Sequence, residues 1–177
     1  MLAGPHVTFR NAARDSNYGA LAAVSLDNPA GPRLVVIEVD DQVVGPLPHI
    51  VKHAPGGFSW GYEGSSPADL ARSLLIHTLG PRAQCTACSG SGMVRVRLEG
   101  GTLERATTAT SATPKRSPDA TSYPVRCTLC DDGCAVLPEV YQKYKHVVVA
   151  RLPLDGWTIP QREILDWLTL AAPDLGR

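Results

Sequence analysis

The sequence has no excess of charge of either sign and no long hydrophobic run. Lysine and arginine together number 17, and aspartate and glutamate also number 17, which excludes a protein that binds nucleic acid through overall basicity. No apolar stretch approaches the roughly 18 residues that a membrane-spanning helix needs. The N-terminus lacks a basic segment followed by an apolar one, so no signal peptide and no membrane association are expected.

Cysteine is scarce too, and its arrangement carries the strongest signal. There are five cysteines, and an odd number does not suit a disulfide framework in a chain without a secretory signal. Four of them form two C-x-x-C pairs, Cys85 with Cys88 and Cys127 with Cys130, a spacing that lets four thiolates surround one zinc ion. A redox-active pair, or two reduced pairs without metal, are the alternatives. Cys134 is a possible replacement for Cys130 as a ligand, or a buried cysteine outside the site.

Two further features support a zinc hairpin. Glycines follow both pairs (Gly90 and Gly92 after the first, Gly133 after the second), and they let backbone N–H groups turn toward the thiolates. Residues 107–122 between the pairs are mostly Thr, Ser, Ala, Pro and charged residues without apolar periodicity. This composition predicts a flexible tip.

The first pair and its glycines, C-T-A-C-S-G-S-G, resemble one C-x-x-C-x-G-x-G repeat of the zinc-binding region of the DnaJ chaperones. The second string, C-T-L-C-D-D-G-C, departs from that repeat because Asp132 stands where the first glycine belongs. The sequence has two such repeats instead of four, and it lacks the His-Pro-Asp signature of a J-domain. The resemblance therefore covers one zinc-ribbon-like hairpin and does not imply chaperone activity.

The first 60 residues are predicted to be rich in antiparallel β-structure. A run at Phe58–Tyr62 alternates large aromatic and small residues, which would place Phe58, Trp60 and Tyr62 on one face of a strand. We expect Trp60 to be buried. Three other short apolar runs, separated by turn residues, are expected to be strands: His6–Arg10, Leu21–Leu26 and Leu34–Val39.

A first helix is predicted after this region. Ser66 suits its N-cap, Pro67 its first position and Asp69 its third position, where a carboxylate complements the helix dipole. Gly80, followed by proline, is expected to end it. The residues predicted to form its buried stripe are Leu70, Leu74 and Leu75.

Two more helices are predicted near the C-terminus. One begins at Pro138, although the run Val147–Val149 would also suit a strand. Its expected face comprises Val140, Tyr144, Val147 and Val148. For the last helix, Thr158 and Gln161 are expected to form a capping box. Its expected face is Ile164, Leu165 and Leu168, with Trp167 at the edge and Pro173 at the end.

Residues 58–71, F-S-W-G-Y-E-G-S-S-P-A-D-L-A, resemble the W-G-Y-G-G-S-G-P-x-x-L-A signature of an uncharacterised domain family of phages, plasmids and bacterial genomes. Residues 141–153 and 157–168 resemble its usual ending, whereas Glu63 and Ser66 stand where the family often has glycine. The resemblance implies a fold and a mobile-element context but no activity. It also makes the cysteine-containing segment an insertion.

These observations predict an α+β protein with an antiparallel sheet, about three helices and an inserted zinc hairpin. The expected organisation is a β-rich core with the first helix at 1–80, the zinc-ribbon-like hairpin at 81–137, and helices that complete the core at 138–177.

The segment Gly61–Pro67 is the candidate ligand loop, because it leads into a helix N-terminus, where N–H groups and the dipole favour an anion. Its candidate residues are Gly61, Gly64, Ser65 and Ser66. The loop has no lysine and no Walker or dinucleotide spacing, so a plain turn is the preferred interpretation. No catalytic residue is predicted, because His49 and His53 are flanked by prolines and the sequence shows no nucleophile–base signature.

The predicted function is that of a non-enzymatic, zinc-containing accessory or interaction protein of a phage or other mobile element. We expect it in the cytoplasm of a bacterial cell or phage-infected host, with a protein as its partner. One alternative is a protein that binds a small anion or nucleotide through Gly61–Pro67. Another is nucleic-acid binding through the hairpin, although zinc-bound thiolates would offset much of the local basic charge.

Overall fold

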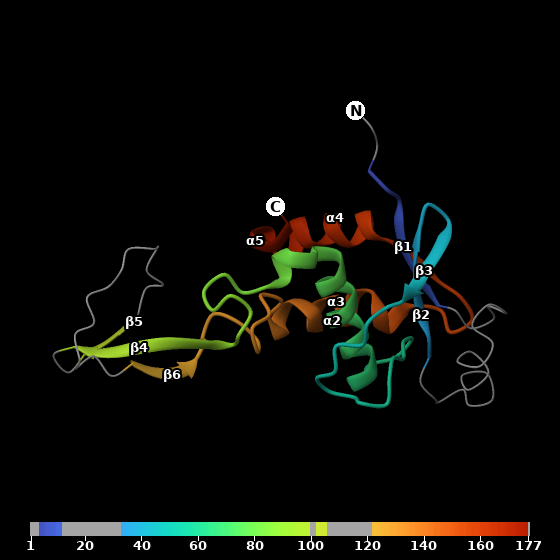
Figure 1. Cartoon of the computed structure of the whole chain (residues 1–177). Coiled ribbons are helices and arrows are strands. Elements are labelled where there is room, and N and C mark those ends of the chain that lie inside the picture. The colour runs from blue at the N-terminus through green and yellow to red at the C-terminus, as the bar shows by residue number, and fades with distance from the viewer. Residues whose placement is uncertain (1–3, 12–32, 100–101, 106–121, 177) are drawn as a thin grey trace. The chain divides into compact units, whose positions relative to one another are not determined.

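Short runs rich in β-branched residues form a four-stranded antiparallel sheet in the computed structural model, which describes residues 4–11, 33–99, 102–105 and 122–176 (Figure 1). Register pairs Phe9 with Ile37 and with Ile159, and all three are buried, so this face of the sheet is apolar core. Asp40 and Asp41 connect two of the strands at positive φ, as a tight hairpin turn requires. The strand order is β3-β2-β1-β7, with β1 at Val7–Asn11, β2 at Val35–Val39, β3 at Gln42–Pro46 and β7 at Thr158–Pro160.

Helices complete an α+β fold, as predicted. The central helix, α2 (Ser65–Leu79), carries the three leucines of the predicted stripe, all fully buried. It packs against both α3 (Pro138–Val147) and α4 (Gln161–Ala171). Single turns of 3-10 helix follow α2 at Gly80–Ala83 and α3 at Val149–Arg151. The helices are α2 (Ser65–Leu79), α3 (Pro138–Val147), α4 (Gln161–Ala171) and the short α5 (Pro173–Gly176). No helix in the described ranges is both long and apolar enough to cross a membrane.

Trp60 lies in the core, as predicted, with 1% of its surface exposed. Its ring meets Trp157 edge to face at a centroid distance of 5.3 Å, and the Arg33 guanidinium lies 4.8 Å from the ring centre. The indole N–H donates to the Pro153 carbonyl at 3.0 Å. Because both the ring and the polar atom have partners, this side chain joins the N-terminal and C-terminal segments of the sequence.

The predicted strands are confirmed in part. The runs at His6–Arg10 and Leu34–Val39 correspond to β1 and β2, whereas Leu21–Leu26 lies outside the described residues. The prediction of a strand over Phe58–Tyr62 is wrong, since only Phe58 pairs, through an isolated bridge to Arg33. Gly61, at φ +80°, turns the chain there and leaves Tyr62 half-exposed instead of placing it in the core.

The predicted helices exist, but two predicted caps are wrong. Gly64 is the N-cap of α2, and no side-chain cap bond is present, so Ser66 does not cap the helix. Thr158 belongs to β7, where it pairs with Arg10, and it is therefore not available for a capping box on α4. The predicted end of α2 at Gly80 is confirmed, and Gly80 has the positive φ that favours glycine.

Helix α3 begins at Pro138 and remains helical to Val147, so the helical alternative holds there. Its buried face differs from the predicted one. Tyr144 is almost fully buried, as predicted, but so is Tyr141, which the predicted face did not include, whereas Val147 is 41% exposed. In α4, Ile164 and Leu168 are buried as expected. Trp167 meets Tyr144 edge to face.

The described chain divides into two compact units, and the first consists of the segments up to Ala83 and from Val136 onward. The second unit, Gln84–Ala135, contains a three-stranded antiparallel sheet in the order β5-β4-β6. Of the predicted tip, residues 107–121 lie outside the described residues, and Ser122 begins β6. The strands are β4 (Met93–Glu99), β5 (Thr102–Arg105) and β6 (Ser122–Arg126).

Candidate metal centre

Two loops of the second unit bring four cysteine sulfurs together. One loop precedes β4 and carries Cys85 and Cys88, and the other follows β6 and carries Cys127 and Cys130. The antiparallel register places the first residue of β4 opposite the last residue of β6, so both loops emerge at the same end of the sheet. The four Sγ atoms lie within 4.8 Å of one another.

The distances between sulfurs suit a metal and not a disulfide. Sγ of Cys85 lies 3.9 Å from Sγ of Cys127, and Sγ of Cys88 lies 3.7 Å from Sγ of Cys130. A tetrahedral shell with metal–sulfur bonds of about 2.3 Å has sulfur–sulfur edges of about 3.8 Å. A disulfide would require about 2.05 Å. The observed spacing therefore matches four thiolates around one ion.

Glycines allow the two loops to pack backbone against backbone. Gly133 has φ +89°, and a Cβ built there would lie 2.1 Å from the Gly90 carbonyl oxygen. Across the same contact the Cys85 N–H donates to the Gly133 carbonyl at 2.9 Å, and the Cys127 N–H donates to the Gly92 carbonyl at 2.8 Å. No residue with a side chain would fit at Gly133 without moving the opposite loop.

Asp132 explains how the second loop departs from the first. It has φ +51°, and Gly90, at the corresponding position of the first loop, has φ +79°. Aspartate is one of the few residues besides glycine that adopts this left-handed conformation. The loop therefore keeps its turn although the glycine is missing.

The thiols have unequal pKa values. Burial opposes ionisation of Cys88, but a hydrogen bond from the Gly92 N–H at 3.3 Å, followed by contacts with neighbouring sulfurs, lowers its pKa to about 7. Burial raises the pKa of Cys130 to about 12, and the adjacent sulfurs add to the rise. Four thiolates at this separation repel one another, so full ionisation needs a cation among them.

The structure brings Cys130, and not Cys134, to the other three cysteines. Cys134 is buried next to the site, and its backbone N–H and carbonyl both bond to Asp131 at 2.9 Å. It also pairs with Gln84 through an isolated antiparallel bridge. Its backbone closes the base of the second unit, while its sulfur lies outside the group of four.

Comparison with known proteins finds a match to the model of one protein family. Residues 27–93 match the model of a family of unknown function, DUF6166. No curated protein and no solved structure gives a match. The DUF6166 match includes residues 58–71, so the predicted resemblance to a family without assigned function is confirmed in that form. The match ends at residue 93, so the resemblance of residues 141–153 and 157–168 to the ending of that family stays a prediction. The signature itself, an origin in phages or plasmids, and the likeness to DnaJ chaperones stay predictions too.

The candidate ligand loop lies within the DUF6166 match. Gly61 donates its N–H to the Val149 carbonyl at 3.1 Å, and a Cβ there would lie 2.6 Å from Leu154. Glu63 in the same loop pairs with Lys145 at 3.1 Å and with His146, both on α3, and these partners lower its pKa, the hydrogen bond from His146 most strongly. The contacts of Gly61 and Glu63 are those of a packed turn, so the ligand loop stays a prediction and a plain turn is still preferred.

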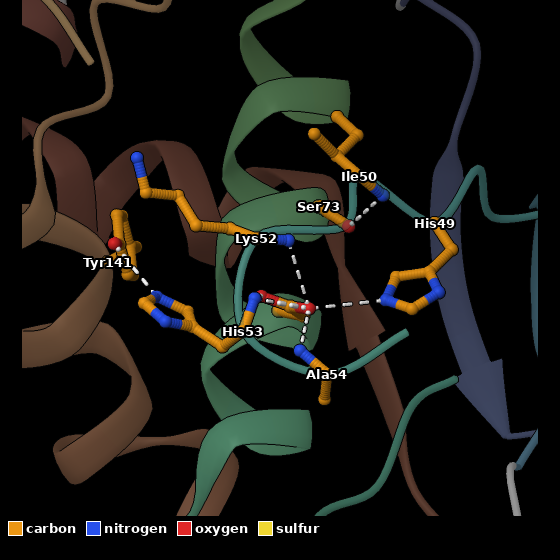
Figure 2. Close-up of polar contacts among 8 residues, drawn as sticks. His49, Ile50, Lys52, His53, Ala54, Ser73 and Tyr141 are labelled. Atoms are coloured by element: carbon orange, nitrogen blue, oxygen red, sulfur yellow. Dashed lines mark hydrogen bonds and ion pairs between the residues drawn. The ribbon is translucent and has the colours of Figure 1, made fainter. Parts of the chain in front are cut away.

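Asp69 has a different role from the one that the sequence predicted. Asp69 on α2 is fully buried, and its carboxylate accepts the backbone N–H groups of Lys52, His53 and Ala54 at 3.2, 3.0 and 2.9 Å (Figure 2). His49 Nε2 lies 3.4 Å from the same carboxylate. The carboxylate fastens this segment to α2, which is a different role from the predicted one at the helix start.

Neighbouring contacts complete this attachment. Ser73, one turn after Asp69, accepts the Ile50 N–H at 3.0 Å, and His53 Nε2 lies 3.0 Å from the Tyr141 hydroxyl on α3 (Figure 2). His49 and His53 therefore face different partners and do not form a metal pair. Two polar residues four apart beside buried leucines were the available sequence signal.

Proposed function

We propose that the four cysteines bind one structural zinc ion, and that the protein is a non-enzymatic accessory or interaction protein. The observation that carries the proposal is the clustering of the four Sγ atoms, which lie within 4.8 Å of one another and include two separations, 3.7 and 3.9 Å, close to the edge of a tetrahedral zinc–thiolate shell. Four thiolates fill the coordination shell of zinc, whereas a catalytic zinc keeps one position open for water or substrate. The ion would hold the second unit folded and would take no part in a reaction.

The donor set narrows the choice of metal. Soft thiolates in a tetrahedral arrangement favour zinc or iron over magnesium, calcium or manganese. Zinc is the common ion of structural four-cysteine sites. Reduced thiolate ligands also suit a cytoplasmic location. A mobile-element context is supported only by the resemblance of residues 58–71, 141–153 and 157–168 to the uncharacterised domain family of phages, plasmids and bacterial genomes.

A protein partner is favoured over nucleic acid. The second unit exposes large apolar side chains at Met93, Tyr123 and Leu129, which are 42%, 48% and 60% exposed. Acidic and basic residues nearly balance between positions 84 and 135. A zinc ion with four thiolates adds two negative charges, and phosphate-driven binding needs a net supply of cations. The apolar side chains are the better anchors.

Metal analysis of the purified protein tests the zinc site. We expect one zinc per chain in the wild-type protein and less than half an equivalent in Cys88→Ser. The matched control is Cys134→Ser, which removes a cysteine of the same unit outside the group of four and should keep the metal. Stoichiometric iron, or a full equivalent of zinc in Cys88→Ser, would refute the proposed site.

Paired substitutions test whether the exposed apolar side chains of the second unit bind a protein partner. Leu129→Ser in the second unit and Val44→Ser in the first change side chains of nearly equal exposure, 60% and 61%. In affinity capture from the native host, a specific protein partner should be lost with Leu129→Ser and kept with Val44→Ser. Equal capture by both variants, or specific recovery of nucleic acid instead of protein, would contradict the assignment.

A further inference from the structure

The chain enters and leaves the second unit at a closed neck. Gln84, the first residue of the unit, pairs with Cys134 in an antiparallel bridge. The next residue, Cys85, donates its N–H to the Gly133 carbonyl at 2.9 Å. Cys85 is also one of the four clustered cysteines. The neck and the candidate metal site therefore share residues.

The residues just outside the neck belong to the core of the first unit. Ala83 ends the turn that follows α2 and is 4% exposed, and Val136 precedes α3 and is fully buried. Helices α2 and α3 pack against each other. Whatever holds the neck closed therefore also holds together the end of one core helix and the start of the next.

We infer that metal binding in the second unit stabilises the first unit, by closing the chain between α2 and α3. The inference rests on the proposed metal site. Without the ion, folding of the first unit must bear the entropy of closing the whole segment Gln84–Ala135. With the ion bound, Cys85 is tied to Cys127 and Cys130, and only a few residues on either side remain to be closed. A cross-link near both ends lowers the cost of closure.

Tryptophan fluorescence isolates the first unit. All three tryptophans, Trp60, Trp157 and Trp167, lie in that unit. Thermal unfolding of the full-length protein is followed by this signal with metal bound and after removal of the metal by a chelator. We expect removal to lower the Tm reported by tryptophan by roughly 5 °C or more. Cys88→Ser should show the low Tm without chelator, and Cys134→Ser should behave as the wild type.

A second variant separates chain closure from other effects of the metal. Gln84→Cys places a thiol opposite Cys134 across the bridge, where directly opposed residues suit a disulfide. The disulfide is formed while metal protects the other four thiols. After oxidation, metal removal should no longer lower the tryptophan-reported Tm, whereas the reduced form of the same variant should still respond.

The outcomes are distinguishable. A wild-type protein that binds no metal contradicts the proposed function itself. Metal that binds and is removed without moving the tryptophan transition overturns the inference and leaves the metal site intact. A persistent drop in Tm after the disulfide has formed overturns closure of the neck as the mechanism.

Discussion

At the scale of single residues, the fully buried carboxylate of Asp69 attaches a loop segment of the first unit to α2. It receives three backbone N–H groups from a segment that lies 15 to 17 residues earlier in the chain. A buried carboxylate without such donors would be strongly destabilising. The segment and the helix therefore depend on each other.

Asp69→Asn should lower the free energy of unfolding by about 1–3 kcal/mol, because the amide places N–H donors against backbone N–H donors. Urea denaturation measures the change. Asp166→Asn on α4 is the matched control, since Asp166 is exposed and its ion pair with Arg162 spans 4.0 Å; its effect should be near zero. Equal effects of the two substitutions would show that the Asp69 contacts contribute little.

His77 gives stability a predictable pH dependence. It lies edge-on to Phe9 at 5.6 Å, and burial lowers its pKa below the ordinary value of 6.5. The unfolded chain therefore takes up the proton first. Stability is unaffected by this group above pH 6.5 and is lost as the pH falls from 6.5 through the lowered pKa of the folded state.

His77→Gln should therefore lose less stability than the wild type between pH 7 and pH 5. Chemical denaturation of both metal-loaded proteins across this range measures the difference, and pH effects on the metal site cancel in the comparison. A wild-type protein that loses no more stability than His77→Gln would show that the folded state does not favour the neutral form of His77.

At the scale of elements, the two cysteine loops form because glycine stands where backbones meet. Gly133→Ala should abolish binding of the one metal ion expected per chain, since the Cβ of the new alanine would lie 2.1 Å from a carbonyl oxygen of the other loop. Gly45→Ala in β3 is the control, because a Cβ there meets nothing within 4 Å. Metal content and far-ultraviolet circular dichroism of both variants test the prediction. Retention of metal by Gly133→Ala would contradict the described packing.

The elements that could be predicted from sequence are those with local signals. Proline at 138, glycine at 80 and the leucine stripe of α2 act within one or two turns, and they placed the helices correctly. The wrong predictions depended on distant partners. The sequence from Thr158 to Gln161 is typical of a capping box, but Thr158 pairs in the sheet with Arg10, which lies near the other end of the chain.

In the candidate site too, the features with local signals could be predicted and those that depend on distant partners could not. The paired spacing of Cys85, Cys88, Cys127 and Cys130 is local, so the sequence predicted the group that the structure brings together. The choice between Cys130 and Cys134 needed the turn that bonds Cys134 to Asp131. The role of Asp69 depends on where residues 52–54 lie in the fold. The helical pattern of the sequence around Asp69 carries no information about that position.

At the scale of the whole molecule, the chain consists of a first unit with the larger core and a second unit organised around sulfur. The first unit has its own buried aromatic and aliphatic core, whereas buried Cys85, Cys88 and Cys127 form the core cluster of the second. The proposed metal would supply the stability that so small an apolar core does not provide.

The composition of residues 107–121 predicts that they are dispensable. Replacing them with a short Gly/Ser turn between β5 and β6 should leave both the metal content and the Tm unchanged, because such a polar segment has no apolar face to bury. Ser122 must be kept, since it belongs to β6. A large loss of metal or of stability would show that this segment packs on the second unit.

X-ray absorption spectroscopy of the purified protein tests the four-cysteine zinc site, because the edge identifies the metal and the fine structure counts its ligands. We expect a zinc edge at one equivalent per chain, with a shell of four sulfur atoms at about 2.3 Å. A stoichiometric iron edge, a shell containing nitrogen or oxygen, or the absence of bound metal would contradict it.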